Sequence, residues 1–122
     1  GELSRIMLSI KNVLADKDDV GTLIFDEVDT GISGAAAQKV GKKLKQVSKG
    51  RQIICVTHLA QVAAFADNHL LISKATENGK TFTSVISLDK EGKICELARI
   101  MGGELTDSLK NSAKELLEAS NG

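Results

Sequence analysis

The most informative part of the chain is Thr22–Gly34, which reads TLIFDEVDTGISG. Its first four residues form a short apolar run, which is typical of a strand buried on both faces, as in a parallel sheet. The run ends in Asp26 and Glu27. In open α/β sheets, ligands bind at the carboxyl ends of the strands, so the sequence predicts a ligand site at these two carboxylates.

Neighbouring residues of a strand point in opposite directions, so Asp26 and Glu27 need different roles or a turn between them. One arrangement uses both: an aspartate that holds Mg²⁺, usually through water, and a glutamate that orients or deprotonates an attacking water. This is the Walker B half of a P-loop NTPase site. The alternative is that the two residues only begin a solvated loop, and for the dipeptide alone this is the simpler interpretation. The rest of the chain favours the nucleotide site.

The composition indicates one globular domain. With 122 residues, 42% of them hydrophobic, the chain has material for one modest core. Its 16 basic and 16 acidic residues cancel, and aromatic residues are scarce, so neither net charge nor base stacking predicts a nucleic-acid surface. Cys55 and Cys95 lack metal-ligand spacing, and Cys55 is predicted to be a small buried hydrophobe. Without a bilayer-spanning run or a signal-peptide pattern, the sequence predicts a cytoplasmic protein with no membrane partner.

A βαβ unit is predicted around this stretch. A helix over about residues 33–48 links the first strand to a second apolar run, residues 52–56. This spacing predicts two parallel strands with a right-handed crossover, whose carboxyl ends lie at the same edge of the sheet. Because His58 follows the second strand, Asp26, Glu27 and His58 are predicted to converge at that edge.

The helix predicted over residues 33–48 has two faces. The residues predicted to face the core are Ala36, Val40, Leu44 and Val47. The opposite side carries Lys39, Lys42, Lys43, Lys45 and Lys49. We interpret this basic face as solvated rather than as a DNA contact. Before the first strand, the apolar positions from Leu3 to Leu14 repeat with helical spacing, which predicts an amphipathic helix there.

A short helix over residues 59–66, a β-hairpin and two further helices complete the predicted fold. The hairpin turns at Asn78-Gly79, in a loop expected to be slightly longer than two residues. One helix is predicted over Lys93–Met101, stopping at two glycines, and Thr106 is predicted to cap the last helix. The fold class is therefore α/β: parallel strands flanked by helices, then a β-hairpin and carboxyl-terminal helices.

Four segments in order resemble the RecN family of bacterial recombinational DNA-repair proteins, which are SMC-like members of the ABC ATPase superfamily. GELSRIMLSIK resembles the end of the family's signature motif and its helix, and TLIFDEVDTGISG resembles its Walker B strand and loop. ICVTHLAQVAAFADNHLLISK resembles the histidine switch segment, and CELARIMGG resembles a motif near the carboxyl terminus. The resemblance implies that residues 1–122 are the carboxyl-terminal lobe of an ABC-type ATPase head, a partial P-loop NTPase fold.

The resemblance also implies a role for each matching residue. Asp26 would hold Mg²⁺ through water, Glu27 would be the catalytic carboxylate for the attacking water, and His58 would contact the γ-phosphate. Gly1 and Glu2 would be the tail of the signature motif, which meets the ATP bound by the opposite subunit. The implied cofactors are ATP and Mg²⁺. The implied partners are a second head, in a homodimer that sandwiches ATP, and DNA, which the full-length protein binds at the bacterial nucleoid.

Two positions depart from the pattern of the wider superfamily. Ser33 stands in the cofactor-contacting loop where an aspartate is common, and Asp29 is a second candidate for a carboxylate nearby. Ala60 stands where a proline is expected.

The phosphate-binding motif GxxxxGK[ST] does not occur in the sequence, and the chain opens on GELSR rather than on Met. We therefore expect a piece of a larger protein that by itself holds ATP poorly and barely hydrolyses it. One alternative function is a nucleotide-independent module that binds protein or DNA. Another is a two-metal hydrolase, which requires a further carboxylate near Asp26, with Asp29 and Asp67 as the candidates.

Overall fold

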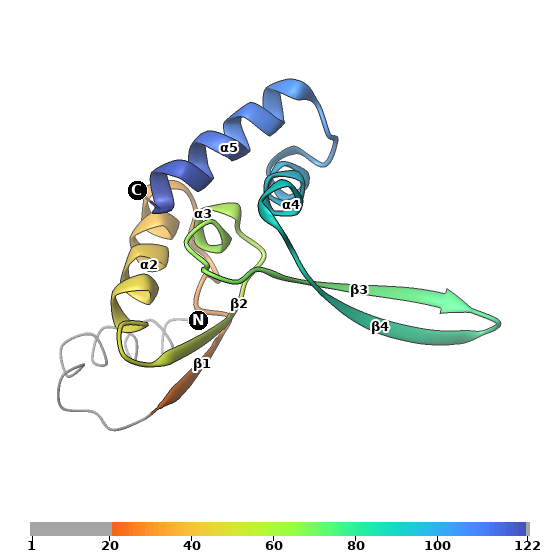
Figure 1. Ribbon diagram of the computed structural model, residues 1–122, viewed down its shortest axis with the longest axis horizontal. Coiled ribbons are helices and arrows are strands. Elements are labelled where there is room, and N and C mark those ends of the chain that lie inside the picture. The colour runs from red at the N-terminus through yellow and green to blue at the C-terminus, as the bar shows by residue number, and fades with distance from the viewer. Residues whose placement is uncertain (1–20, 122) are drawn as a thin grey trace.

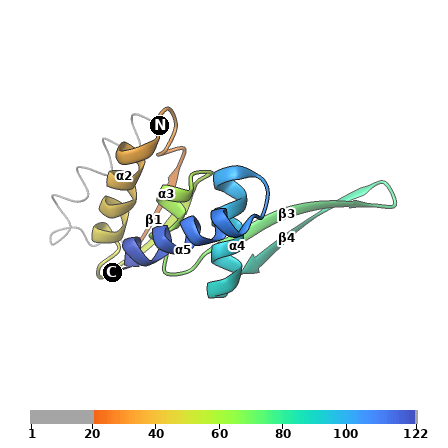
Figure 2. The ribbon, with the colours of Figure 1, turned by 90° about the horizontal axis from the view of Figure 1, so that it is seen from above.

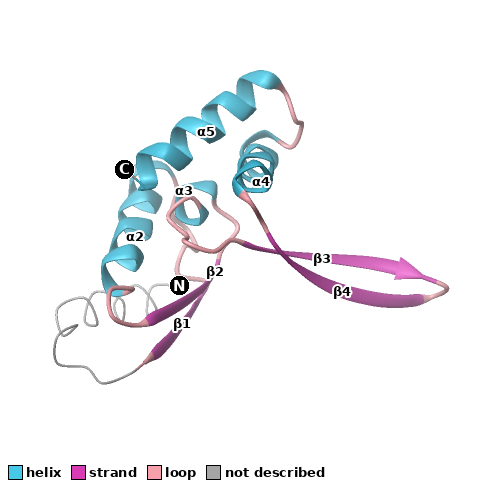
Figure 3. Cartoon of the chain, viewed as in Figure 1, coloured by secondary structure: helices cyan, strands magenta, loops and turns pink. Residues whose placement is uncertain are grey.

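The structure is a computed structural model that describes residues 21–121. The helix predicted from Leu3 lies outside this range. The first half of the described chain contains β1 (Thr22–Asp26), α2 (Gly34–Val47), β2 (Gln52–Val56) and α3 (Ala60–Ala63). The second half contains β3 (Leu70–Glu77), β4 (Lys80–Ser87), α4 (Lys90–Gly102) and α5 (Asp107–Asn121). Figure 3 shows this division into a helical body with a short sheet and a separate hairpin.

The βαβ prediction is confirmed. Strands β1 and β2 pair in parallel, with Thr22 opposite Gln52 and Asp26 opposite Val56. Alternate residues of both strands, including Phe25, pack with α2 in a first core of Phe25, Val28, Ala37, Leu44, Val47 and Val62. This packing places Leu23, Phe25, Ile53 and Cys55 on the face of the sheet that α2 covers.

The prediction that β1 is buried on both faces is wrong in this structure. Ile24 is 70% exposed, and on the neighbouring strand Ile54 is 43% and Val56 is 51% exposed. These side chains alternate with those that pack on α2, so they lie on the opposite face of the two-stranded sheet. An apolar run reveals what a strand is able to bury, whereas actual burial depends on whether a second layer covers the far face.

The buried face of helix α2 begins one residue later than predicted. The buried residues are Ala37, Gly41, Leu44 and Val47, whereas Ala36, which was predicted to face inward, is exposed. Gly41 lies against Phe65: a Cβ atom added at Gly41 would overlap Cδ2 of the ring and stand 2.8 Å from Cε2. The absence of a side chain at Gly41 therefore permits the close approach of α2 to the segment that follows α3.

The hairpin is longer and its turn tighter than predicted. Glu77 pairs with Lys80, so the loop is Asn78-Gly79 alone, two residues rather than more. Both have positive φ, 51° and 77°, as a type I′ turn requires. The apolar pattern did not predict the extra strand residues, because the residues next to the turn are polar or small. Figures 1 and 2 show the hairpin projecting away from the helices in both views.

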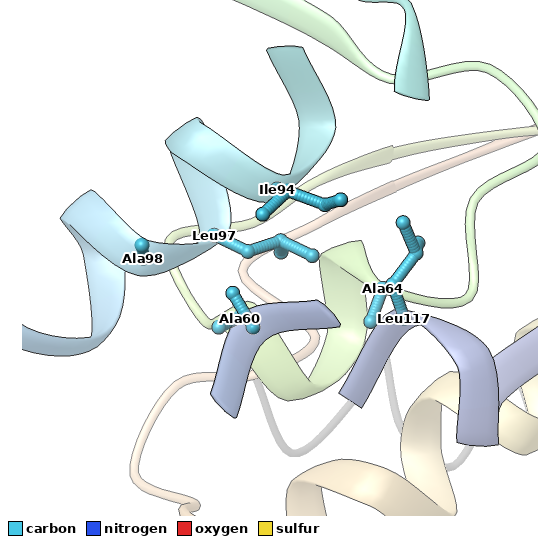
Figure 4. Packing of buried hydrophobic residues seen from close by; sticks show 7 residues of the cluster. Ala60, Ala64, Ile94, Leu97, Ala98 and Leu117 are labelled. Carbon is cyan, nitrogen blue, oxygen red and sulfur yellow. The ribbon is translucent and has the colours of Figure 1, made fainter. Parts of the chain in front are cut away.

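A second core joins three helices. Its buried residues are Ala60, Ala64, Ile94, Leu97, Ala98, Ala113 and Leu117, contributed by α3 and the residue after it, α4 and α5. Figure 4 shows the side chains of the three helices meeting there. The predicted cap of α5 is confirmed, because the Thr106 hydroxyl accepts a hydrogen bond from the Leu109 N–H at 3.1 Å.

Helix α4 begins three residues earlier than predicted, at Lys90 instead of Lys93. The reason is a cap at Asp89, whose side chain accepts a hydrogen bond from the Gly92 N–H at 2.7 Å. The helix ends before Gly103, which has φ 79°, as the predicted glycine stop requires. Met101, expected on the buried stripe, is 38% exposed.

Candidate functional site

The carboxyl ends of β1 and β2 lie at the same edge of the parallel pair. Asp26 is the last residue of β1 and is opposite Val56, the last residue of β2. Glu27 and His58 lie in the loops that follow these two strands, and all three predicted site residues are exposed. The structure therefore places Asp26, Glu27 and His58 at one edge, where open α/β sheets bind ligands.

A turn separates the two adjacent carboxylates. Glu27 has φ 59°, a left-handed conformation that is uncommon for a residue with a side chain. The Glu27 carbonyl accepts a hydrogen bond from the Thr30 N–H at 3.2 Å, which closes a tight turn directly after the strand. Residues held in this conformation cost on the order of 1 kcal/mol and concentrate at functional sites. The turn allows Asp26 and Glu27 to serve different roles at the same strand end.

Asp29 is the buried carboxylate of the site, with only 2% of its surface exposed. One oxygen, Oδ2, accepts a hydrogen bond from the Thr57 hydroxyl and another from the His58 backbone N–H at 3.2 Å. The same oxygen lies 3.5 Å from Nδ1 of the His58 imidazole. Asp29 thus joins the loop after β1 to the loop after β2.

The sequence identified Asp29 only as a substitute for Ser33 or as an extra metal ligand. Its position against His58 depends on a contact between residues 29 positions apart in the chain. The topology could have indicated this contact. Asp29 lies in the loop after one parallel strand, and Thr57 and His58, which carry several hydrogen-bond donors, directly follow the next strand.

Cys55 lies on β2 beneath this edge and packs against the first core while remaining partly exposed. Burial raises the pKa of its thiol from 9.0 to about 11, and the negative charges of Asp29 and Asp26 add to the rise. The prediction of a small hydrophobic residue is consistent with a thiol that stays neutral at physiological pH.

The other predicted residues lie away from this network or outside the described range. Ser33 is exposed at the amino-terminal end of α2 and makes no side-chain cap there. Gly1 and Glu2 lie outside the described residues. Asp67 forms an ion pair with Lys45 of α2, which removes that lysine from the solvated basic face.

Three or more side chains of the metal-ligating types do not group together anywhere in residues 21–121. The two-metal hydrolase therefore lacks a ligand cluster in the part of the chain that the structure describes. In the same range, no helix has the length and apolar content needed to cross a bilayer.

The chain is similar to known proteins in both sequence and fold. No protein-family model matches the chain. The DNA repair protein RecN of Bacillus subtilis (strain 168) is 51% identical over 119 residues, 97% of this chain and 21% of that protein. RecN of Vibrio cholerae is 50% identical over 120 residues, covering 98% of this chain and 22% of that protein. By sequence, the chain belongs to the RecN family. It spans about a fifth of the length of these relatives.

The fold also has a solved counterpart. A chain from structural work on the ATP-driven dimerization and DNA-stimulated activation of SMC ATPases superposes with a TM-score of 0.61. The match covers 86% of this RecN-family chain and 63% of the solved chain, at 24% sequence identity. The parallel pair, the hairpin and the helices are thus part of a P-loop NTPase-type fold of the SMC kind.

Proposed function

We propose that residues 1–122 form the carboxyl-terminal lobe of an ABC/SMC-type ATPase head, in a bacterial protein that repairs DNA double-strand breaks. The observation that carries this proposal is the shared strand edge, where Asp26, Glu27 and His58 lie together beside the buried Asp29. The sequence relation to RecN and the SMC-type fold support it.

The residues at this edge fit hydrated Mg²⁺ and a nucleotide phosphate. Mg²⁺ in such sites keeps several waters and uses one or two carboxylates together with phosphate oxygens, so it needs no cluster of protein ligands. Asp26 offers an exposed carboxylate at the strand end, and His58 offers a largely exposed imidazole across the edge. When bound, Mg²⁺ neutralises charge on the β- and γ-phosphates.

Each residue at the edge has a distinct task in this proposal. Asp26 holds Mg²⁺ through water. Glu27, turned away from the strand by its left-handed backbone, orients and deprotonates the attacking water. His58 contacts the γ-phosphate. Gly1, Glu2 and Ser33 contact the ATP held by the other head of a homodimer, which brings two heads together around the nucleotide.

This lobe supplies only the water-activating half of the site. The sequence contains no phosphate-binding GxxxxGK[ST] loop, so the lysine and backbone amides that cradle the phosphates come from elsewhere in the full-length protein. We expect purified chain 1–122 to release no phosphate from ATP above background. Turnover by this chain that disappears in Asp26→Asn would contradict the proposal.

The roles of Asp26 and Glu27 are tested in the full-length protein that carries this segment. Glu27→Gln keeps the size of the side chain but removes the base, so ATP binding stays nearly intact while hydrolysis falls by roughly 10²–10⁴-fold. Blocked hydrolysis then traps the closed dimer. Asp26→Asn weakens the binding of Mg²⁺, so both ATP binding and closure of the dimer decline. His58→Ala changes hydrolysis in the same direction as Glu27→Gln.

The measurements are ATP-dependent dimerisation by gel filtration and phosphate release, made on each variant. Asp67→Asn is the matched control, because it removes a carboxylate that pairs with Lys45 away from the strand edge. Parental hydrolysis by Glu27→Gln, or dimerisation of Asp26→Asn equal to that of Glu27→Gln, would show that the two roles are wrongly assigned.

A nucleotide-independent interaction module is the second candidate. The projecting hairpin favours it, because every residue of β4 is exposed and apolar side chains such as Phe82, at 54% exposure, face solvent. The same measurements decide between the two, since a module of this kind loses no function when Asp26 or Glu27 is changed.

A further inference from the structure

We propose that Asp29 is a positioning residue for His58, whose buried carboxylate fixes which ring nitrogen of the imidazole faces the strand edge. This inference rests on the proposed function, because it gives His58 its orientation for the phosphate contact. It goes beyond that function by assigning a task to a residue that does not itself touch nucleotide.

The carboxylate of Asp29 contacts both the backbone and the side chain of His58. Oδ2 accepts a hydrogen bond from the His58 N–H at 3.2 Å, which holds the backbone of His58, and lies 3.5 Å from Nδ1, within ion-pair distance of the ring. The hydrogen bond restricts the position of the residue, and the nearby carboxylate favours the ring orientation in which Nδ1 faces Asp29. With Nδ1 turned toward Asp29, the opposite nitrogen, Nε2, points away from the carboxylate, and the side chain as a whole is 77% exposed.

The charge of Asp29 supports the same conclusion. Burial of a carboxylate costs more than burial of a neutral acceptor, and Asp29 is only 2% exposed. The Thr57 hydroxyl and the His58 N–H are neutral donors, which an amide oxygen would also satisfy. Among the contacts of Asp29 within residues 21–121, the imidazole is the partner for which a carboxylate is better than an amide, because a carboxylate oxygen is the stronger acceptor for a hydrogen on Nδ1.

Thr57 completes the arrangement. Its hydroxyl donates to Asp29 and accepts a hydrogen bond from the Leu59 N–H at 3.1 Å. The residues on both sides of His58 are therefore anchored, and the loop between β2 and α3 has little freedom to reorient the ring. The partners of metal-ligating histidines typically change affinity or activity by roughly 10–100-fold when they are removed, and we expect an effect at the lower end of that range for Asp29.

The test is a double-mutant cycle in the full-length protein, with kcat and KM for ATP measured separately. Asp29→Asn keeps an acceptor for Thr57 and the His58 N–H but removes the charge. We expect kcat to fall by about 10-fold with little change in KM, because the residue acts through His58 and not on nucleotide binding. Introduced into His58→Ala, the same substitution should cause no further fall. Asp67→Asn, the matched carboxylate control, should leave both constants unchanged.

The possible outcomes separate the inference from the function it rests on. An equal fall in kcat in both backgrounds, or no effect of Asp29→Asn while His58→Ala slows turnover, overturns the positioning role and leaves the proposed function standing. A rise in KM with kcat unchanged also overturns it. If His58→Ala turns over ATP at the parental rate, the proposed role of His58 fails, and the role of Asp29 fails with it.

Discussion

Gly41 of α2 and the ring of Phe65 touch so closely that no side chain fits between them: a Cβ atom at Gly41 would stand 2.8 Å from Cε2 and 3.1 Å from the Gln61 carbonyl oxygen. In most helix interiors, replacing glycine by alanine is stabilising. Here the first core sets the separation of the two segments, and the added methyl group has no space.

Gly41→Ala is therefore expected to lower the free energy of unfolding by about 1–3 kcal/mol, as overpacked cores do. Urea denaturation measures the change. In a Phe65→Leu background the smaller side chain yields room, so the same substitution should cost much less or become stabilising. An equal loss in both backgrounds would show that the contact with the ring is not the cause.

The left-handed backbone at Glu27 leads to a second prediction. Both Glu27→Ala and Glu27→Gly remove the carboxylate, but only glycine accepts φ 59° without strain. The glycine variant should be more stable than the alanine variant by about 1 kcal/mol, and the proposed role of Glu27 predicts that both should lose ATP hydrolysis in the full-length protein.

Gln38, exposed in α2, provides the control, because glycine there should be less stable than alanine. Denaturant unfolding compares the alanine and glycine variants at Glu27 with the alanine and glycine variants at Gln38. If alanine were the more stable residue at both positions, the conformation at Glu27 would not be strained.

The thiol of Cys55 should resist alkylation. Its pKa is raised to about 11, mainly by burial and then by the charges of Asp29 and Asp26, and iodoacetamide reacts with the thiolate. At pH 8 its thiolate fraction is roughly 100-fold below that of a thiol at the ordinary value of 9.0. Peptide mapping by mass spectrometry should show slow modification in native protein and fast modification in urea.

The pH dependence of stability follows from the same shift. The unfolded chain loses the Cys55 proton above pH 9.0, whereas the folded chain keeps it to about pH 11, so stability falls as pH rises through this window. Cys55→Ala should remove this part of the decline. Asp26→Asn, which deletes one of the charges, should lower the alkylation midpoint, and Asp67→Asn should not. A midpoint near 9 in native protein would contradict the burial argument.

Purified chain 1–122 is expected to self-associate. Apolar side chains are exposed on the outer face of the β1–β2 pair and along the hairpin, where Ile72 and Val85 are register partners on one face, each 59% exposed. Light scattering should show a mass above that of one chain. Replacing both residues by threonine should reduce the association, whereas replacing the polar pair Thr76 and Thr81 by alanine should not. A monomer at high concentration, without detergent or ligand, would contradict the prediction.

Local patterns in the sequence predicted the fold well where neighbouring residues decide the structure. The strands β1 and β2, the position of the turn at Asn78-Gly79 and the Thr106 cap all follow from apolar runs, backbone preferences or a hydroxyl at a helix start. These signals operate over a few residues, so they survive without knowledge of the rest of the chain.

Features that depend on distant partners were missed. Whether Ile24 is buried depends on what covers the far face of the sheet, and its exposure of 70% has no local signal. The task of Asp29 depends on Thr57 and His58, which the parallel topology brings to it from another loop. The strand edge itself was predictable, because topology alone places Asp26 and His58 together, but the hydrogen bonds that hold it were not.

The single turn of α3 lies between two cores, because Val62 packs with the sheet and α2 while Ala60 packs with α4 and α5. The Asn121 side chain at the end of α5 also donates to the Ala64 carbonyl at 3.1 Å. If α3 unwinds, both cores lose packing contacts at the same time. The loop that carries His58 then loses its support as well. We therefore expect the strand edge and the carboxyl-terminal helices to open as one cooperative unit, with amide protons on α5 exchanging with solvent at the same free-energy cost as those around His58.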